Sequence, residues 1–119
     1  MENCIFCKIR DRAIPAEFIY EDESIMVFPD IHPIKPVHLL IVPKKHIEDF
    51  LMMNDPHNAR ASRGKEELMM QIIRITQEMV KKFQLENKGY RVGINGGGAQ
   101  LINHLHVHLF GPLEKAAAM

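Results

Sequence analysis

Three histidines near the C-terminal end of the sequence alternate with apolar residues. His104, His106 and His108 occupy every second position of residues 103–110. Because successive side chains of a β-strand point to opposite faces, a strand over this segment would place the three imidazoles on one face and the apolar residues on the other. An imidazole can act as nucleophile, base or acid near neutrality, since its ordinary pKa is about 6.5. Neutral imidazoles also ligate zinc, so the spacing alone is compatible with a nucleophilic site and with a metal site.

The only two cysteines of the sequence, Cys4 and Cys7, are separated by two residues. In a reducing compartment such a pair is more often a metal or redox site than a structural disulfide. We expect a metal site rather than a redox site, because the pattern does not predict that the pair opens a helix after a buried strand. Two thiolates are half of the four ligands that a structural zinc ion takes, and two thiols without a partner are the alternative.

Composition limits both the size of the protein and its class. A chain of 119 residues predicts one domain, residues 1–119, and 46% hydrophobic residues are enough for a core. Fifteen basic residues balance fifteen acidic ones, so the basic excess of a nucleic-acid-binding protein is absent. The sequence shows neither a secretory signal nor the roughly 18 consecutive apolar residues of a membrane span, and we expect a soluble cytoplasmic protein.

The elements that must position the histidines follow from hydrophobic periodicity. Short runs rich in β-branched, aromatic and other apolar residues predict strands at residues 18–20, 25–28, 38–42, 90–95 and 104–110, and a proline-rich loop separates the second from the third. Apolar residues at helical spacing predict one long amphipathic helix from about Ser62 to Phe83, preceded by one or two helical turns near residues 47–52. Together these elements predict an α+β domain, in which one long helix and one short helix pack on an antiparallel sheet of about five strands.

Several short motifs occur in an order and at a spacing that resemble those of a known family. They are Cys4-Ile-Phe-Cys7, Ile14-Pro15, Tyr20-Glu-Asp22, Asp30-Ile31, His38 to Pro43-Lys-Lys-His46, Gly89-Tyr-Arg91, Asn95, Ala99-Gln100 and His104-Leu-His106-Val-His108-Leu-Phe110. The chain is similar over nearly its whole length to the histidine triad (HIT) family of nucleotide hydrolases and transferases, and most similar to its Hint-type nucleoside phosphoramidase branch. The resemblance implies the HIT-like fold for the α+β domain.

The resemblance also implies a mechanism. His106 would attack the α-phosphorus of a nucleoside phosphoramidate, an adenylate or a dinucleoside polyphosphate, and water would hydrolyse the nucleotidyl-histidine that forms. The backbone carbonyl of His104 would orient His106, and His108 would lie beside the phosphoryl oxygens. His38 would be the fourth histidine of the site, which orients the triad or contacts phosphate.

A purine nucleotide pocket is implied by the same correspondence. Five apolar residues would line the nucleobase slot, although each of them could equally be an ordinary core residue: Phe6, Ile14, Phe28, Ile31 and Leu40. Asp30 would accept hydrogen bonds from the ribose hydroxyls. Asn95 and Gln100 would hold the phosphate or the leaving group. Leu101 occupies the next position, where members of the family commonly carry a hydroxyl residue that assists the leaving group.

Many bacterial members of the family complete a structural zinc site on the cysteine pair. The residues implied here are Cys4, Cys7, His46 and His104, and the resemblance implies no organic cofactor. It also implies a homodimer with the long helix at the interface, and neither a nucleic acid nor a membrane as a partner. Two other functions remain open from the residues: a zinc hydrolase whose metal is held by the three alternating histidines, and a nucleotide-binding scaffold without catalysis.

Overall fold

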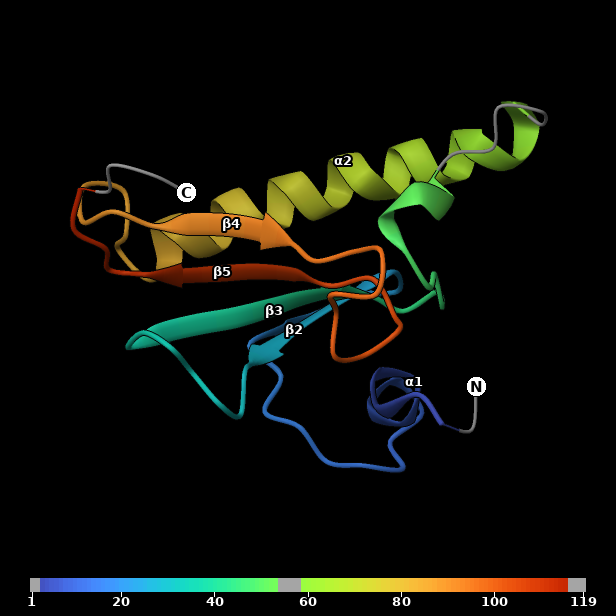
Figure 1. The fold of residues 1–119 in the computed structure, drawn as a ribbon, viewed down its shortest axis with the longest axis horizontal. Helices are drawn as coiled ribbons and strands as arrows, with labels where there is room; N and C mark the ends of the chain where they lie inside the picture. Colours follow the sequence, from blue (N-terminus) through green and yellow to red (C-terminus); the bar gives the residue numbers. More distant parts are fainter. Residues whose placement is uncertain (1–2, 54–58, 116–119) are drawn as a thin grey trace.

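Five strands form one antiparallel sheet in the order β1-β2-β3-β5-β4 (Figure 1). The strands are β1 (Tyr20–Glu21), β2 (Ile25–Pro29), β3 (Val37–Pro43), β4 (Arg91–Ile94) and β5 (Val107–Gly111). The helices are α1 (Ile5–Arg10), the short 3₁₀ helix η1 (Phe50–Met53) and α2 (Ala59–Lys82). The structure is a computed structural model that describes residues 3–53 and 59–115. Its α+β architecture, with five strands and one long helix, is the one that the sequence predicts.

Both faces of the central strands are buried, and the period of two along each strand divides the core into two parts. Ile25 and Val27 of β2 pack with Leu39 of β3 in the cluster that also contains the buried side of α2. The intervening residues, such as Met26 and Phe28, pack on the opposite face, in the cluster that contains α1. Figure 1 accordingly shows α2 along one side of the sheet and α1 on the other.

The long helix α2 is held by a stripe of buried residues at helical spacing. Leu68, Ile72, Ile75, Met79 and Val80 are each at most 9% exposed. Spacings of three or four residues from Leu68 to Met79, together with the neighbouring Val80, keep them on one face, which covers the sheet. Lys81 and Lys82 lie in the last turn, where positive charge interacts favourably with the helix dipole. No helix among the described residues is both long enough and apolar enough to cross a membrane.

The structure differs from the predicted elements at several places, and the first strand, expected at residues 18–20, is Tyr20–Glu21. The helix α1 was not predicted, although its last turn carries the favourable cations Lys8 and Arg10. The helix α2 begins at Ala59 rather than near Ser62. The strand β2 extends through Pro29, which was assigned to the loop. The strand β5 begins at Val107 rather than at residue 104, because the preceding backbone bonds elsewhere: the Leu105 N–H donates to the Ile47 carbonyl at 2.6 Å.

Strand pairing brings His38 and His108 together. In the β3–β5 register, His38 is opposite Phe110 and Leu40 is opposite His108. His38 and His108 are therefore diagonal neighbours on one face of adjacent strands, a separation that long or aromatic side chains bridge. Residues that are 70 positions apart in the sequence thus share one site on the α1 side of the sheet.

Candidate active site and metal centre

The three alternating histidines do not form one cluster. Only His108 lies within β5, whereas His104 and His106 precede the strand. The alternation nevertheless continues through the segment, because Leu105, Val107 and Leu109 all pack in the core that contains α2. His104 is fully buried and His106 is 7% exposed. The prediction of one apolar and one imidazole face is therefore confirmed, whereas a regular strand over all three histidines was wrong.

The ring of His106 is fixed by the backbone two residues earlier. His106 Nδ1 lies 2.7 Å from the carbonyl oxygen of His104. A carbonyl oxygen only accepts, so the proton of the neutral ring is on Nδ1 and the lone pair is on Nε2. The Phe6 ring meets His106 edge-on, with ring centroids 5.0 Å apart. His106 also lines a cavity, so its free nitrogen belongs to a rigid ring beside an open space.

His108 and His38 form a second pair beside His106. His108 Nδ1 lies 3.0 Å from His38 Nε2, and its ring centroid is 4.9 Å from that of His106. Asp30 Oδ2 lies 3.5 Å from His38 Nε2. Burial, and then the charges that His106 and His38 would carry, lower the pKa of His108 to about 4, although Asp30 acts in the opposite direction. His108 is therefore neutral near pH 7.

A cavity of about 490 Å³ opens in front of His106 and His108. Its volume is within the range of pockets that hold small molecules, roughly 300–1,000 Å³. Eight of the residues predicted for the nucleotide or the chemistry line it: Phe6, Ile14, Phe28, Asp30, Leu40, Asn95, His106 and His108. Two more, Ile31 and Leu101, lie at its rim and are 85% and 100% exposed. The sequence prediction thus converges on one cavity.

Besides His104, two predicted residues lie outside the lining of this cavity. The Gln100 side chain donates to the Glu48 carbonyl at 3.2 Å and to Asp49 Oδ1 at 3.3 Å, so it ties its loop to the segment before η1. His38 lies behind His108 and reaches the cavity only through it. In this conformation the Gln100 side chain holds its loop, and its contact with the phosphate or the leaving group stays a prediction.

Sequence patterns did not predict that Ile9 and Ile102 line the cavity. Ile9 lies on α1, and Ile102 precedes the triad. Ile9 follows Phe6 by three residues, the spacing of neighbours on one helix face, and this signal could have identified α1. Among the described residues that line the cavity there is no lysine or arginine, whereas Glu17 and Asp30 are carboxylates.

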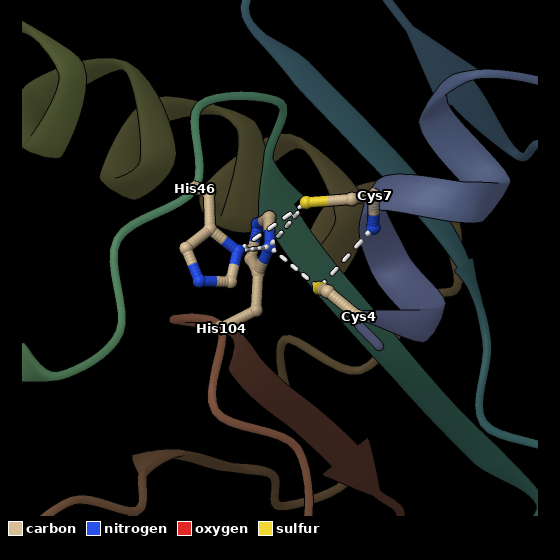
Figure 2. A group of neighbouring side chains, drawn as sticks. All are labelled: Cys4, Cys7, His46 and His104. Atoms are coloured by element: carbon tan, nitrogen blue, oxygen red, sulfur yellow. Dashed lines mark hydrogen bonds between the residues drawn. The ribbon is translucent and has the colours of Figure 1, made fainter. Parts of the chain in front are cut away.

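The remaining histidine of the triad belongs to a different site. Cys4, Cys7, His46 and His104 converge at the start of α1, and Figure 2 shows their side chains directed toward one another. His104 Nδ1 lies 3.3 Å from Cys4 Sγ and 3.1 Å from His46 Nδ1, and Cys7 Sγ lies 3.3 Å from His46 Nδ1. In a tetrahedral zinc site with ordinary bond lengths, the ligand atoms lie about 3.3–3.8 Å apart. The donor set and its spacing therefore fit a four-coordinate zinc ion.

A hydrogen bond of His104 and a longer contact of His46 engage the imidazole nitrogens that face away from this cluster. His104 Nε2 lies 2.7 Å from the Pro43 carbonyl and must donate to it, which leaves the Nδ1 lone pair for the cluster. His46 Nε2 lies 3.9 Å from Glu48 Oε1. Metal-binding histidines commonly have such a carbonyl or carboxylate on their second nitrogen. With both nitrogens engaged, His104 does not share a metal with His106 and His108, which argues against the hydrolase with three histidine ligands.

The cysteine pair is unsuited to redox chemistry. Cys7 is buried, and burial followed by the hydrogen bond and charge of Cys4 raises the pKa of the Cys7 thiol to about 11. A reactive cysteine needs a lowered pKa and access to solvent. The pair lies at the N-terminus of α1, where Cys4 Sγ accepts from the Cys7 N–H at 3.3 Å, and among the described residues no strand precedes this helix.

Comparisons with known proteins agree with this geometry. The HIT domain family model matches residues 11–115. Protein HitA of Neisseria gonorrhoeae is 37% identical over 113 residues, which are 93% of this chain and 97% of that protein. A 14 kDa zinc-binding protein of Zea mays is 39% identical over 109 residues, covering 90% and 80% of the two chains. The crystal structure of a HIT family hydrolase from Legionella pneumophila superposes with a TM-score of 0.84 at 38% identity, covering 97% of each chain. The chain therefore belongs to the HIT domain family.

Proposed function

We propose that the protein is a nucleotide hydrolase in which His106 is the nucleophile. One observation carries this proposal: the 2.7 Å hydrogen bond to the His104 carbonyl holds the His106 proton on Nδ1 and leaves Nε2 free beside the cavity. Membership of the HIT family and the similarity to solved HIT family hydrolases support hydrolysis as the reaction class.

The chemistry proceeds in two displacements at phosphorus. His106 Nε2 forms a bond to the α-phosphorus, and the bond between phosphorus and the leaving group breaks with its electron pair on the leaving group, which takes up a proton from solvent. The hydrogen bond from Nδ1 to the carbonyl stabilises the positive charge that develops on the ring. Water then forms the new P–O bond and releases a proton to solvent, the bond between phosphorus and His106 Nε2 breaks, and His106 regains its lone pair. Dividing one difficult displacement into two easier ones is the advantage of such covalent catalysis.

The cavity favours a nucleotide that carries a single phosphate. The apolar walls from α1, β2 and β3 suit a nucleobase, and we assign Asp30, which lines the same cavity, to the ribose hydroxyls. Since the described lining residues include two carboxylates and no lysine or arginine, the several negative charges of a dinucleoside polyphosphate would lack compensation. A purine nucleoside phosphoramidate or an adenylate is therefore the substrate class that we propose.

Zinc is proposed as a structural ion on Cys4, Cys7, His46 and His104. The four donor atoms fit it, and a Zea mays relative is named as a zinc-binding protein. When bound, the ion cross-links the start of α1 to the segment before β5. That link positions Phe6 against the rings of both His104 and His106, with centroid distances of 5.6 and 5.0 Å. Zinc would thereby support the geometry of the nucleophile without taking part in the displacement.

A homodimer through α2 and β4 is also proposed. Ile73, Tyr90 and Val92 are 43–45% exposed and line an apolar groove of about 510 Å³ between the two elements. The strand β4 lies at the edge of the sheet, and one side of its backbone pairs with no strand among the described residues. Exposed apolar patches beside an open edge strand are typical of surfaces that a second chain covers.

The function is tested by turnover of an adenosine 5′-phosphoramidate. The variant His106→Asn is expected to lose at least a thousandfold in kcat, since it lacks the nucleophilic nitrogen. The matched control is His32→Asn, which also changes a histidine of the cavity but removes no group used in the displacement. Binding of AMP without turnover by the wild-type protein would instead support the nucleotide-binding scaffold.

A further inference from the structure

A chain of hydrogen bonds leads from the loop before β3 to the wall of the cavity. The Ile34 N–H donates to His38 Nδ1 at 3.1 Å. The other nitrogen of that ring, His38 Nε2, lies 3.0 Å from His108 Nδ1. His108 in turn lines the cavity beside His106. One backbone amide is thus connected, through two imidazoles, to the space where the phosphoryl group would lie.

The first bond of this chain decides where the protons of both rings are. A backbone N–H only donates, so His38 Nδ1 must accept and cannot carry a proton. The proton of the neutral His38 ring is then on Nε2, from which it donates to His108 Nδ1. Since His108 Nδ1 accepts, the proton of the neutral His108 ring is on Nε2. The reverse assignment would leave His38 without any proton, as an anion.

We propose that the backbone N–H of Ile34 is a positioning group that makes His108 a hydrogen-bond donor toward the substrate. This inference rests on the proposed function, because the donor is useful only if a phosphoryl group lies in the cavity. A phosphoryl oxygen that gains negative charge during the displacement is stabilised by an N–H that already points at it. The opposite ring tautomer of His108 would present a lone pair to the same oxygen and repel it.

The architecture of the loop is suited to this role. The Asp30 N–H donates to the His38 carbonyl at 2.9 Å, and Asp30 Oδ1 accepts from the His32 N–H at 2.9 Å. These two bonds close the loop onto the first residues of β3, which brings the Ile34 amide to the His38 ring. The Ile34 side chain is 65% exposed. The loop therefore needs the backbone of Ile34 at this position rather than its side chain.

The hydrogen bond from the Ile34 N–H to His38 Nδ1 also distinguishes the group Asp30, His38 and His108 from the zinc site. Asp30, His38 and His108 place their potential ligand atoms within 4.8 Å of one another, as a metal site does. However, His38 Nε2 carries a proton when Nδ1 accepts from Ile34, and it has no lone pair for a cation. In the cysteine cluster a lone pair is available instead. The His104 Nε2–H donates to the Pro43 carbonyl, so the Nδ1 atom that faces the sulfurs carries no proton.

The test is the tautomer of each histidine in the protein with its structural metal bound, measured by NMR from the ¹⁵N shifts of the ring nitrogens. Both His38 and His108 are expected as Nε2–H tautomers in the wild type at pH 7.5. The variant Ile34→Pro lacks the donor, and it is expected to give mixed tautomers and a fall in kcat of about tenfold to a hundredfold for the phosphoramidate. The matched control, Ile34→Ala, keeps the N–H and is expected to retain both the wild-type tautomers and kcat within about twofold.

The wild-type spectrum decides the proposal even if Ile34→Pro fails to fold. An Nδ1–H tautomer of either His38 or His108 in the wild type would overturn it, as would an Ile34→Pro protein that folds and keeps Nε2–H at both rings. Failure of the proposed function would look different. In that case the wild type would show the expected tautomers but would not turn over the phosphoramidate.

Discussion

The Nδ1 atom of His106 lies 2.7 Å from the carbonyl oxygen of His104, and this contact couples the two sites of the protein. The backbone of His104 orients His106, the proposed nucleophile, while its side chain faces Cys4, Cys7 and His46. Any change that moves residue 104 therefore alters both the metal site and the position of His106 Nε2. The histidine triad is thus one sequence motif that serves two different sites.

Loss of the metal is expected to destabilise the protein. The variant Cys4→Ser removes one of four ligands and the sulfur that caps α1, so it should bind zinc weakly and unfold more readily. If the free zinc concentration is about a thousand times the Kd of the wild type, the loss of zinc binding lowers the free energy of unfolding by about 4 kcal/mol. Metal analysis and thermal unfolding measure both effects.

The control for this prediction is Glu48→Gln. Its carboxylate lies 3.9 Å from His46 and is 62% exposed, so zinc should stay bound with little loss of stability. A wild-type protein purified without zinc, together with unchanged stability of Cys4→Ser, would contradict the structural role of the ion.

Asp30 is expected to confer a preference for ribonucleotides over 2′-deoxyribonucleotides. A hydrogen bond to a charged acceptor contributes about 1.5–3 kcal/mol, which corresponds to roughly a tenfold to hundredfold preference in kcat/KM. Asp30→Asn should reduce this preference severalfold, because the amide is a weaker acceptor. Glu17→Gln is the matched control, since it neutralises the other carboxylate of the cavity. Equal discrimination by wild type and Asp30→Asn would exclude the assigned contact.

Acid is expected to destabilise the fold through His108. Its folded pKa of about 4 lies below the ordinary 6.5, so between these pH values the unfolded chain binds more protons than the native state. The free energy of unfolding should therefore fall as pH decreases from about 6.5 to 4, and this contribution is fully present above 6.5. For one histidine the slope is at most about 1.4 kcal/mol per pH unit, less any solvent screening of the half-buried ring.

Urea unfolding of zinc-loaded protein at several pH values measures this slope. The variant His108→Asn lacks the titrating group, so its stability should depend less steeply on pH in the same window. Parallel curves for the two proteins would show that His108 does not have a lowered pKa.

The dimer proposal predicts that Ile73→Glu dissociates the protein. A carboxylate on the apolar surface between α2 and β4 would have to be buried without a partner when a second chain covers it. Sedimentation should then give the mass of one chain. Ile31→Glu places the same charge at the rim of the active-site cavity, and it should leave the dimer intact. A monomeric wild type would refute the proposal.

Sequence patterns predicted the strands and the long helix of this protein, because the spacing of apolar residues reflects which side chains are buried. The continuous apolar run of β2 follows from burial of both faces of the strand, and the helical stripe of α2 follows from burial of one face of the helix. The six-residue α1 escaped prediction, since so short a helix gains little from its own hydrogen bonds and depends on packing under the sheet. The convergence of His38 on His108 depends on the β3–β5 register, and the contact of Ile34 depends on loop geometry. Neither has a signature in residue types or spacing.

The central claim is that His106 becomes nucleotidylated during turnover. Quenching a reaction of the zinc-loaded protein and an adenosine 5′-phosphoramidate with denaturant at alkaline pH, which preserves the acid-labile P–N bond, followed by peptide mass spectrometry, tests it most directly. The expected result is one adenylate added to the protein, located on His106, absent from His106→Asn and present in the His32→Asn control. An adduct on His108 or another residue, or full turnover by His106→Asn, would contradict the account.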